Sequence, residues 1–564
     1  MPWTEVRGPH PMVPSWCRNP QPCNGYIDEV PTTGNQAVEA SAPPTASAKR
    51  AASFAGVRRR FDQAFDVADP ADTGSRPIAL IVWAVWAIVV LALIITHDPW
   101  RDELQAWGLA RASGTPIDVI FNIRHEGHPP TWYLLLWPVA KIIPSTIGLQ
   151  IVVFFVGVAA TGITLLKMPV SLWLRSAIVF SYFPLFELGT ISRSYSLTWL
   201  LVVVALWLTN RTGTANWIIA LVLVALAGTT VLAIPLAVAI AIGIWGGPWF
   251  ASRERGPLNL AWMALFVVVP AAIAAIAVPA SGGGPAVNLS KLSPTAVWDA
   301  FASVLRAAFP VTNSDDAFWG RFVVLGWTTW GPILGAAFVI ALAWSVRRSR
   351  TALTVWVLST SGYIAMLAIT QVPMAPRLVS PLWSGAIAAI WFAAVDRRSR
   401  PVDSRPPISI ITKLGIVFLL SASLWASAWA AWIGTAIPFT TAAAAADWIK
   451  AEADGNDFVI LCVINAPMCS SVSIRLDVPA YSSANGKSFA FVDWNAGWSN
   501  TIRASEVPGV AAKLAARTGA EVFIVAPTRG YPLGCQNGLA PPPRVVTEYL
   551  LVCRADQLVT FPVD

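Results

Sequence analysis

The feature that most constrains this chain is the series of long apolar runs that begins at residue 77. A run of about 17 to 25 apolar residues is long enough to cross the hydrocarbon core of a bilayer as a helix. Such runs lie at 77–96, 148–166, 176–192, 194–209, 257–279, 322–346, 352–369, 378–395 and 408–432. A further run, 216–250, is too long for one crossing and is expected to fold back near 228–235. The sequence therefore predicts an α-helical polytopic membrane protein with about eleven spans.

The composition supports the same class. Of the 564 residues, 55% are hydrophobic and 12% are charged, whereas soluble domains carry about 25% charged residues. The formal net charge is +8, but Lys and Arg collect in the cytoplasmic loops of membrane proteins. The basic balance therefore does not indicate nucleic acid, and we expect no nucleic-acid partner.

The distribution of charge predicts which side of the membrane each part occupies. Residues 1–76 are rich in Pro, Ser, Ala and Thr and contain the basic segment 58–60, so we expect a disordered cytoplasmic tail. No secretory signal precedes the first span, so we expect that span to stay in place in the plasma (inner) membrane. The membrane domain would cover 77–435, and its first loop, 97–147, would lie outside.

This orientation requires that the apolar segment 131–143 does not cross. The segment has a Lys at position 141 and Pro at positions 130 and 144 on either side of it. It is too short to span, so we expect a helix that lies in the interface or re-enters the membrane. With about eleven spans, residues 436–564 would then be extracytoplasmic.

Beyond residue 436 the pattern becomes that of a small α/β domain. TAAAAADWIKAEA and VPGVAAKLAARTG predict helices, and DFVILCVI, EVFIVAP and VVTEYLLVC predict strands. Four of the six Cys lie here, which suits an oxidising compartment and two disulfides. No glycine-rich phosphate loop opens a helix, so nucleotide binding is not expected. This domain could either position the acceptor or pack against the membrane domain, and the sequence favours neither role.

The stretch from His97 to Tyr133 gathers titratable groups between apolar segments. The groups that can hold or move a proton are Asp98, Asp102, Glu103, His125, Glu126 and His128. Three of the four His in the chain lie in this stretch. Such a loop beside an apolar scaffold indicates chemistry at the outer face of the membrane. Asp98 precedes Pro99, and we expect it to cap a helix that starts at Arg101.

Three further segments would bring charge to the same face. The orientation places Glu187, Arg193 and Tyr195 at the outer end of the third span, and Arg377 in a later outer loop. The loop 281–321, with Lys291 and Arg306, would add a short amphipathic helix that lies on the membrane or covers the site. Charges at span ends are costly, so they indicate a functional site. Snorkelling to the interface is the alternative.

These motifs resemble the GT-C superfamily, and more closely the bacterial relatives of protein O-mannosyltransferases and of the aminoarabinose transferase of lipid A. The matching positions are Asp102-Glu103 in the first loop, His128-Pro129-Pro130 in EGHPPTWYLLL, and Arg193-Ser194-Tyr195 in ISRSYSL. The resemblance covers roughly residues 77 to 210, with Arg377 beyond it. Relatives often have Pro or Met at the position of Ser194, and the later spans match no second motif.

The resemblance implies a sugar donor linked to polyprenyl phosphate, an acceptor hydroxyl, and inversion at the anomeric carbon. A carboxylate must take the proton of the attacking hydroxyl, and Asp102 is the expected base. Glu103 would position the acceptor or share a metal. Positive charge must stabilise the departing phosphate, and Arg193 and Arg377 suit this role, with Tyr195 as a hydrogen-bond donor. The acceptor would be a glycan, a lipid or a protein.

The other polar groups of the first loop are expected near the substrates. His128 would contact the donor phosphate or hold the loop against the membrane, with Glu126 and Glu187 as further substrate-binding groups. His125 and His128 with Glu126 also suit a divalent metal, although Pro129 and Pro130 prevent a regular helical ligand spacing. No other cofactor is expected.

Two alternative functions share many of these features. A polysaccharide polymerase or ligase would use the same donor chemistry with a different acceptor. A transporter of lipid-linked glycans would also have many spans, but it would normally show paired broken helices from an internal repeat, and no such repeat is evident in the sequence.

Overall fold

The computed structural model describes residues 64–68, 74–126, 128–211, 213–246, 268–269, 272, 292–311, 330–370, 376–401, 404–405, 407–463, 466–492, 502–527, 533–539, 544–545 and 550–560. The predicted tail (apart from 64–68 and 74–76), the predicted span 257–279 (apart from 268–269 and 272) and the first part of 322–346 lie outside these ranges.

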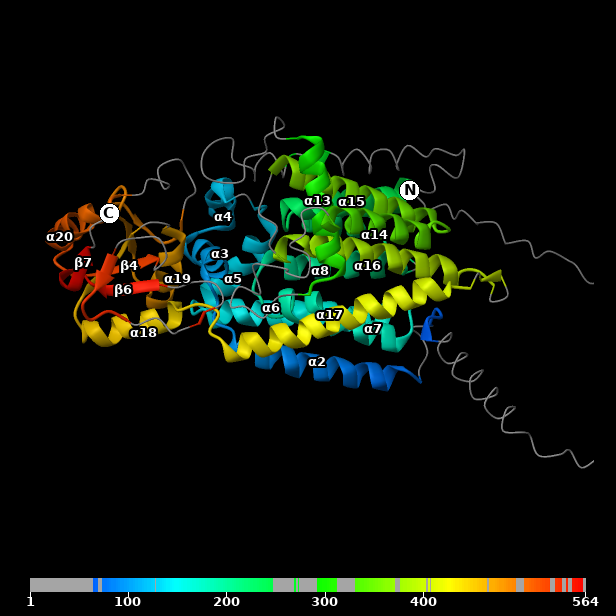
Figure 1. Ribbon diagram of the computed structural model, residues 1–564, viewed down its shortest axis with the longest axis horizontal. Coiled ribbons are helices and arrows are strands. Elements are labelled where there is room, and N and C mark those ends of the chain that lie inside the picture. Colours follow the sequence, from blue (N-terminus) through cyan, green and yellow to red (C-terminus); the bar gives the residue numbers. More distant parts are fainter. Residues whose placement is uncertain are drawn as a thin grey trace, which may run out of the picture. The chain divides into compact units, whose positions relative to one another are not determined.

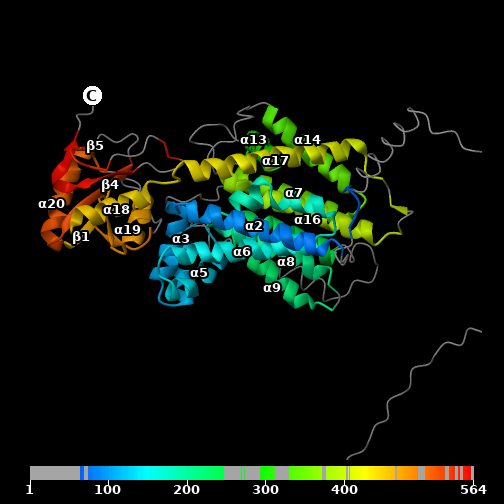
Figure 2. The ribbon, with the colours of Figure 1, turned by 90° about the horizontal axis from the view of Figure 1, so that it is seen from below.

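Apolar helices dominate the described part of the chain. This architecture is that of a multi-span membrane protein. Within it, five helices are long and apolar enough to cross a bilayer: α2 (Arg76–Thr96), α6 (Ile147–Lys167), α15 (Arg350–Thr370), α16 (Pro376–Arg398) and α17 (Ile410–Ala436). Figures 1 and 2 show α2, α6, α16 and α17 running alongside one another. Ile95 is 72% exposed and Phe155 64% exposed, as expected for side chains that face lipid.

Shorter apolar helices complete this bundle. They are α8 (Ser194–Thr209), α9 (Asn216–Ala227), α10 (Ile234–Ala241) and α14 (Trp330–Val346). The predicted break in 216–250 is confirmed, because α9 ends at Ala227 and α10 begins at Ile234. The amphipathic helix predicted in 281–321 is α13 (Pro294–Ala308), which packs closely on α14: a Cβ on Gly335 would collide with the carbonyl oxygen of Phe301.

The predicted third span, 176–192, is not one continuous helix. It consists of α7 (Leu172–Val179) and a π-helix, η2 (Phe183–Glu187). Pro184 has no amide hydrogen to donate, and a π-helical turn carries one extra residue. The hydroxyl of Ser423 on α17 accepts the Tyr182 amide at 3.2 Å. The break therefore lies where a second helix supplies a hydrogen-bond acceptor.

The first loop is largely helical. It contains α3 (Arg101–Ala112), α4 (Pro116–Asn122), the 3-10 turn η1 (Ile123–His125) and α5 (Thr131–Ile142). The short helix predicted at 131–143 is therefore present, with 12 residues. Trp107, Trp132 and Leu136 form a buried apolar cluster that also includes Leu149 of α6. Ile474, from the C-terminal part of the chain, belongs to the same cluster.

The C-terminal part is the predicted α/β domain. Its helices are α18 (Ala442–Ala453), α19 (Ala466–Leu476) and α20 (Val507–Thr518). Its strands are β1 (Phe458–Cys462), β2 (Ala480–Ser482), β3 (Ser488–Phe489), β4 (Glu521–Pro527), β5 (Leu533–Cys535), β6 (Leu550–Arg554) and β7 (Leu558–Thr560). The five-stranded sheet has the order β3-β2-β1-β4-β6, with β1 parallel to β2 and β4.

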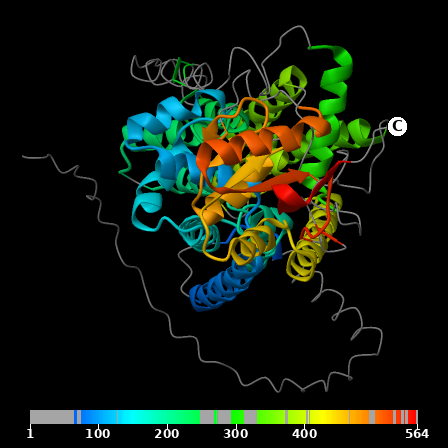
Figure 3. The ribbon, with the colours of Figure 1, turned by 90° about the vertical axis from the view of Figure 1, so that its left-hand side faces the viewer.

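Apolar layers cover both faces of this sheet. Ile449 of α18 and Val472 of α19 pack with Phe523 on one face, and Leu514 of α20 packs with Ile524 on the other. Figure 3 faces this domain and shows α20 in orange in front of the strands. The two predicted disulfides are present, Cys462–Cys469 and Cys535–Cys553. Helix α19 and the short strands β2, β3, β5 and β7 were not predicted.

Candidate functional site

The Glu103 carboxylate joins α3 to a turn that is distant in sequence. Its side chain is completely buried. Oε2 accepts the Trp100 amide at 3.0 Å and lies 2.9 Å from Nε2 of His97, while Oε1 accepts the amide of Ser192. Both oxygens are therefore used in buried contacts. The effect is to fix the first turn of α3 against the turn that precedes α8.

Asp102 makes a direct ion pair across this junction. Its Oδ2 lies 3.0 Å from Nη1 of Arg193, and its Oδ1 lies 3.4 Å from Nε of Arg101. Arg193 precedes α8 in an extended conformation and is 8% exposed. The Asp102 side chain keeps 23% of its surface exposed. The structure thus brings the first loop and the Arg-Ser-Tyr turn into contact, with the carboxylate still accessible.

His128 extends this contact. Its Nε2 lies 3.5 Å from Nη2 of Arg193, and its Nδ1 lies 3.0 Å from the carbonyl oxygen of Glu126. A guanidinium can only donate, so Nε2 must accept from Arg193; a carbonyl can only accept, so Nδ1 must donate to Glu126. This geometry fits a neutral imidazole with its proton on Nδ1. We refer to Asp102, Glu126, His128 and Arg193 as the first-loop cluster.

Two buried tyrosines border the first-loop cluster. Tyr133 and Tyr195 are 4% and 1% exposed. Burial raises the pKa of the Tyr133 hydroxyl well above its ordinary value, and the negative charge of Glu126 raises it further, against the opposing effect of Arg193. Tyr133 therefore stays protonated and able to donate. It was not predicted as a site residue, although it lies in the motif EGHPPTWYLLL that supplied His128.

Gln105 was also not predicted as part of the site. Its amide nitrogen donates to the Glu126 carboxylate and, at 2.7 Å, to the carbonyl oxygen of Val492. Its amide oxygen accepts the Val492 amide at 3.0 Å. A neutral side chain without a motif gives no sequence signal of such contacts. Gln105 thereby links the first-loop cluster to the C-terminal domain.

The prediction that Asp98 caps α3 is wrong. The residue before the helix is Trp100, and the Glu103 carboxylate accepts its amide. Asp98 instead pairs with Arg475 of α19 and accepts the Ala443 amide of α18 at 3.4 Å. The carboxylate faces a guanidinium here, and an ion pair with a guanidinium is stronger than a bond to a neutral helix amide. Burial raises the pKa of Asp98, which Arg475 only partly offsets.

The remaining predicted residues lie elsewhere or are not placed. Glu187 is completely buried in the π-helix η2, where it accepts the Tyr182 hydroxyl at 3.4 Å. The backbone of Arg377 lies in the first turn of α16 and that of His125 in η1, but both side chains lie outside the described residues, as does Lys291.

The described residues hold no group of three or more His, Cys, Asp or Glu side chains that is suited to a metal ion. Because the side chain of His125 is outside the described part, metal binding by His125 and His128 stays a prediction.

Comparison with known proteins finds matches among solved structures. No protein-family model matches the chain, and no curated protein matches it. Among solved structures, the chain matches the crystal structure of ArnT from Cupriavidus metallidurans bound to undecaprenyl phosphate. The match covers 86% of this chain and 98% of that chain, with 12% sequence identity and a TM-score of 0.43.

Proposed function

We propose that this protein is a membrane glycosyltransferase. It would move a sugar from a polyprenyl-phosphate-linked donor to an acceptor hydroxyl at the outer face of the membrane, with inversion at the anomeric carbon. The observation that supports this most is the contact of 3.0 Å between Asp102 and Arg193, next to the ends of apolar helices. Such a pair supplies the two groups that the reaction requires, a proton acceptor and a cation for phosphate.

Asp102 is the proposed general base. The acceptor oxygen attacks the anomeric carbon, its proton passes to the Asp102 carboxylate, and the bond from the anomeric carbon to the phosphate oxygen breaks. The electron pair of that bond leaves with the lipid phosphate. Contact with Arg193 keeps Asp102 ionised before the reaction, and the exposed part of the side chain leaves room for a hydroxyl to approach.

Arg193 is the proposed contact of the departing phosphate. A guanidinium carries five N–H donors, and those facing Asp102 and His128 account for only part of them. A phosphate that binds Arg193 would compete with Asp102 for this cation. The carboxylate would then lose part of its stabilisation and accept a proton more readily. Donor binding would in this way prepare the base.

The other predicted groups take supporting roles. Tyr195 would donate to the same phosphate, and Arg377 would add a second cation from the start of α16. Glu103 acts as a positioning residue, because its oxygens hold the turn of Ser192 and thereby set the distance between Asp102 and Arg193. The acceptor class is open at this stage: a glycan, a lipid or a protein.

The test is a transfer assay on membranes that contain the wild type or Asp102→Asn, supplied with radiolabelled polyprenyl-phosphate sugars. Loss of the base should lower the transfer rate by about 10² to 10⁴-fold, while donor binding persists because Asn keeps the size of the side chain. Asp457→Asn, which changes an exposed carboxylate in the C-terminal domain, serves as the matched control and should transfer normally.

Two results would contradict the proposal. Undiminished transfer by Asp102→Asn would remove Asp102 as the base. Movement of a lipid-linked glycan across vesicles by the wild type, without transfer to any acceptor, would favour the transporter alternative.

A further inference from the structure

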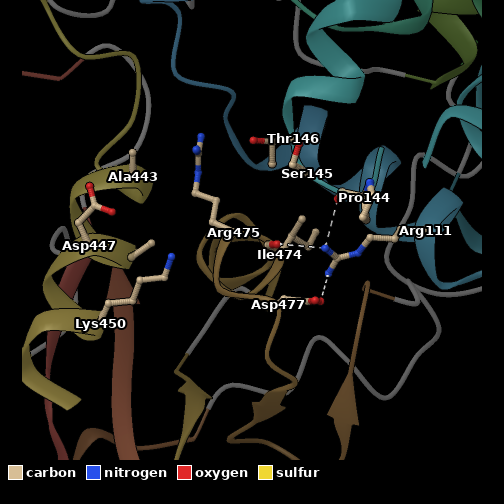
Figure 4. A pocket seen from close by; sticks show the side chains of 11 residues that line it. Arg111, Pro144, Ser145, Thr146, Ala443, Asp447, Lys450, Ile474, Arg475 and Asp477 are labelled. Carbon is tan, nitrogen blue, oxygen red and sulfur yellow. Dashed lines mark hydrogen bonds and ion pairs between the residues drawn. The ribbon is translucent and has the colours of Figure 1, made fainter. Parts of the chain in front are cut away.

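A pocket of about 410 Å³ opens beside the opposite end of α3 from the first-loop cluster. Three parts of the chain line it: the last turn of α3 with Arg111, the segment 144–146 before α6, and the facing sides of α18 and α19 (Figure 4). None of its lining residues belongs to the proposed reaction centre. The pocket is large enough for a small polar ligand, and pockets of this size are common ligand sites.

Cations and carboxylates alternate around this pocket. Arg111 lies 2.8 Å from Asp477, and Arg475 pairs with Asp98. Asp447 and Lys450 lie three residues apart on α18, so they share one face of that helix. Figure 4 shows both side chains at the pocket, and it marks no hydrogen bond or ion pair from either to the other residues that it draws.

This alternation favours an uncharged, hydroxyl-rich ligand. Arg111 pairs with Asp477 and Arg475 with Asp98, and Lys450 shares its helix face with Asp447, so these formal charges balance. A bound phosphate or carboxylate would add negative charge to this balanced set. A sugar hydroxyl both donates and accepts, so it fits between a cation and a carboxylate without changing the net charge. The hydroxyls of Ser145 and Thr146 add further partners.

A small apolar surface in the same pocket suits the carbon face of a sugar ring. Ala443, Ala446, Pro144 and Ile474 line it together with the polar groups. Such a surface is too limited for a lipid chain, because it consists of two alanine methyl groups, one proline and one isoleucine and is interrupted by charges. A polyol with an apolar face and hydroxyl edges therefore matches the lining best.

We infer that this pocket binds neutral sugar residues of the acceptor, so that the acceptor is a glycan. The inference rests on the proposed function, since it assigns the acceptor class of that reaction. Helix α3 connects the two places: from Asp102 to Arg111 it rises about 14 Å. Because residues 103–110 of α3 are buried, an oligosaccharide held by α18 and α19 would have to be longer than this distance and pass outside the helix to reach the proposed base.

The test is a binding measurement that needs no donor. The full-length protein in lipid nanodiscs is applied to immobilised gluco-, manno-, galacto- and arabino-oligosaccharides, each beside a version that carries a hexuronate or a phosphate. We expect the wild type to bind at least one neutral series. The double variant Asp447→Ala/Lys450→Ala should lose about tenfold or more in affinity, because hydrogen bonds to charged groups are lost.

The control variant is Asp457→Asn/Lys513→Ala, which removes an exposed acid and an exposed base of the same domain away from the pocket. It should bind like the wild type. The inference is overturned if no neutral series binds, if the pocket variant binds like the control, or if the anionic glycans bind more tightly than the neutral ones.

The two proposals fail separately. Asp102→Asn should bind the neutral glycan normally, since it does not line the pocket. Normal transfer by Asp102→Asn would remove the proposed base and leave the glycan measurement standing. Conversely, loss of transfer in Asp102→Asn without any neutral glycan binding would overturn only the inference about the pocket.

Discussion

The two ends of α3 hold charges in different ways. At the first turn, Glu103 is completely buried and Arg193 nearly so, and each makes several contacts between segments. At the last turn, Arg111 faces an open pocket, and its partner Asp477 has an 80% exposed side chain. A buried charge is costly to leave unpaired, whereas an exposed pair contributes little. The first turn of α3 therefore fixes the positions of Asp102 and Arg193, while the last turn leaves Arg111 accessible to a ligand in the pocket.

The largest effect that tests this comparison is expected for Glu103→Ala. This change leaves the amides of Trp100 and Ser192 without their acceptor in a buried place. Removal of one partner from a buried charged network costs about 3–5 kcal/mol. We expect a strongly lowered unfolding temperature, measured by tryptophan fluorescence of the purified protein.

Asp102→Asn is the matched variant at the neighbouring position. Its amide oxygen can still accept a hydrogen bond from Arg193 and the side chain is partly exposed, so the loss of stability should be clearly smaller than for Glu103→Ala although transfer is strongly lowered. If the two variants unfold at the same temperature, the distinction between a positioning and a catalytic carboxylate does not hold.

A smaller effect, dependent on pH, is expected for the pair Asp98 and Arg475. Because burial raises the pKa of Asp98, its contribution to stability is complete below the ordinary value near 4. That contribution is lost as the pH rises through the raised pKa of the folded state. Arg475→Met removes the attraction and raises this pKa further. The variant should lose about 1–3 kcal/mol at pH 7 and recover part of it near pH 4.

Unfolding midpoints between pH 4 and pH 8 check this prediction. In the double variant Asp98→Asn/Arg475→Met no group titrates at position 98, so the additional loss of stability at high pH should disappear. A pH profile of Arg475→Met that parallels the wild type would show that the charge of Asp98 is not the cause.

The smallest effect concerns Gly108, which lies between the two ends of α3. A Cβ at this position would lie 2.5 Å from Cδ1 of Ile474 and 3.1 Å from the carbonyl oxygen of Ala490. Because the nearest atom ends a flexible side chain, Gly108→Ala should destabilise the protein by about 1 kcal/mol. Gly509→Ala in α20 is the control, because no described atom lies within 4 Å of that position. It should be stabilising by up to about 1 kcal/mol.

The membrane helices could be predicted from the sequence because hydrocarbon thickness dictates their length. Helices α2 and α6 begin and end within a residue or two of the predicted runs. The break between α7 and η2 could not be predicted in this way, since hydropathy is uniform across it and only Pro184 marks it. Helix α19 was missed because its Ser-rich sequence has a weak apolar pattern, and packing against α3 and α18 stabilises it.

The candidate site was predictable where residue type alone limits the chemistry. Asp102, His128 and Arg193 are charged or titratable groups beside apolar runs, and the structure brings them together. The roles of Asp98 and Gln105 could not be predicted from the sequence, because their partners in the C-terminal domain lie about 350 to 390 residues further along the chain. A local pattern carries no information about such partners.

The bond between Gln105 and Val492 spans 387 residues, and this has a consequence for biosynthesis. At about 5–20 residues per second, the ribosome completes Val492 on the order of 20 to 80 s after Gln105. During this interval Gln105 lacks its partner from the C-terminal domain. The contacts of α3 with Ser192 and with the apolar cluster of α5 and α6 can form early, whereas its link to the C-terminal domain forms only after Val492 has been synthesised.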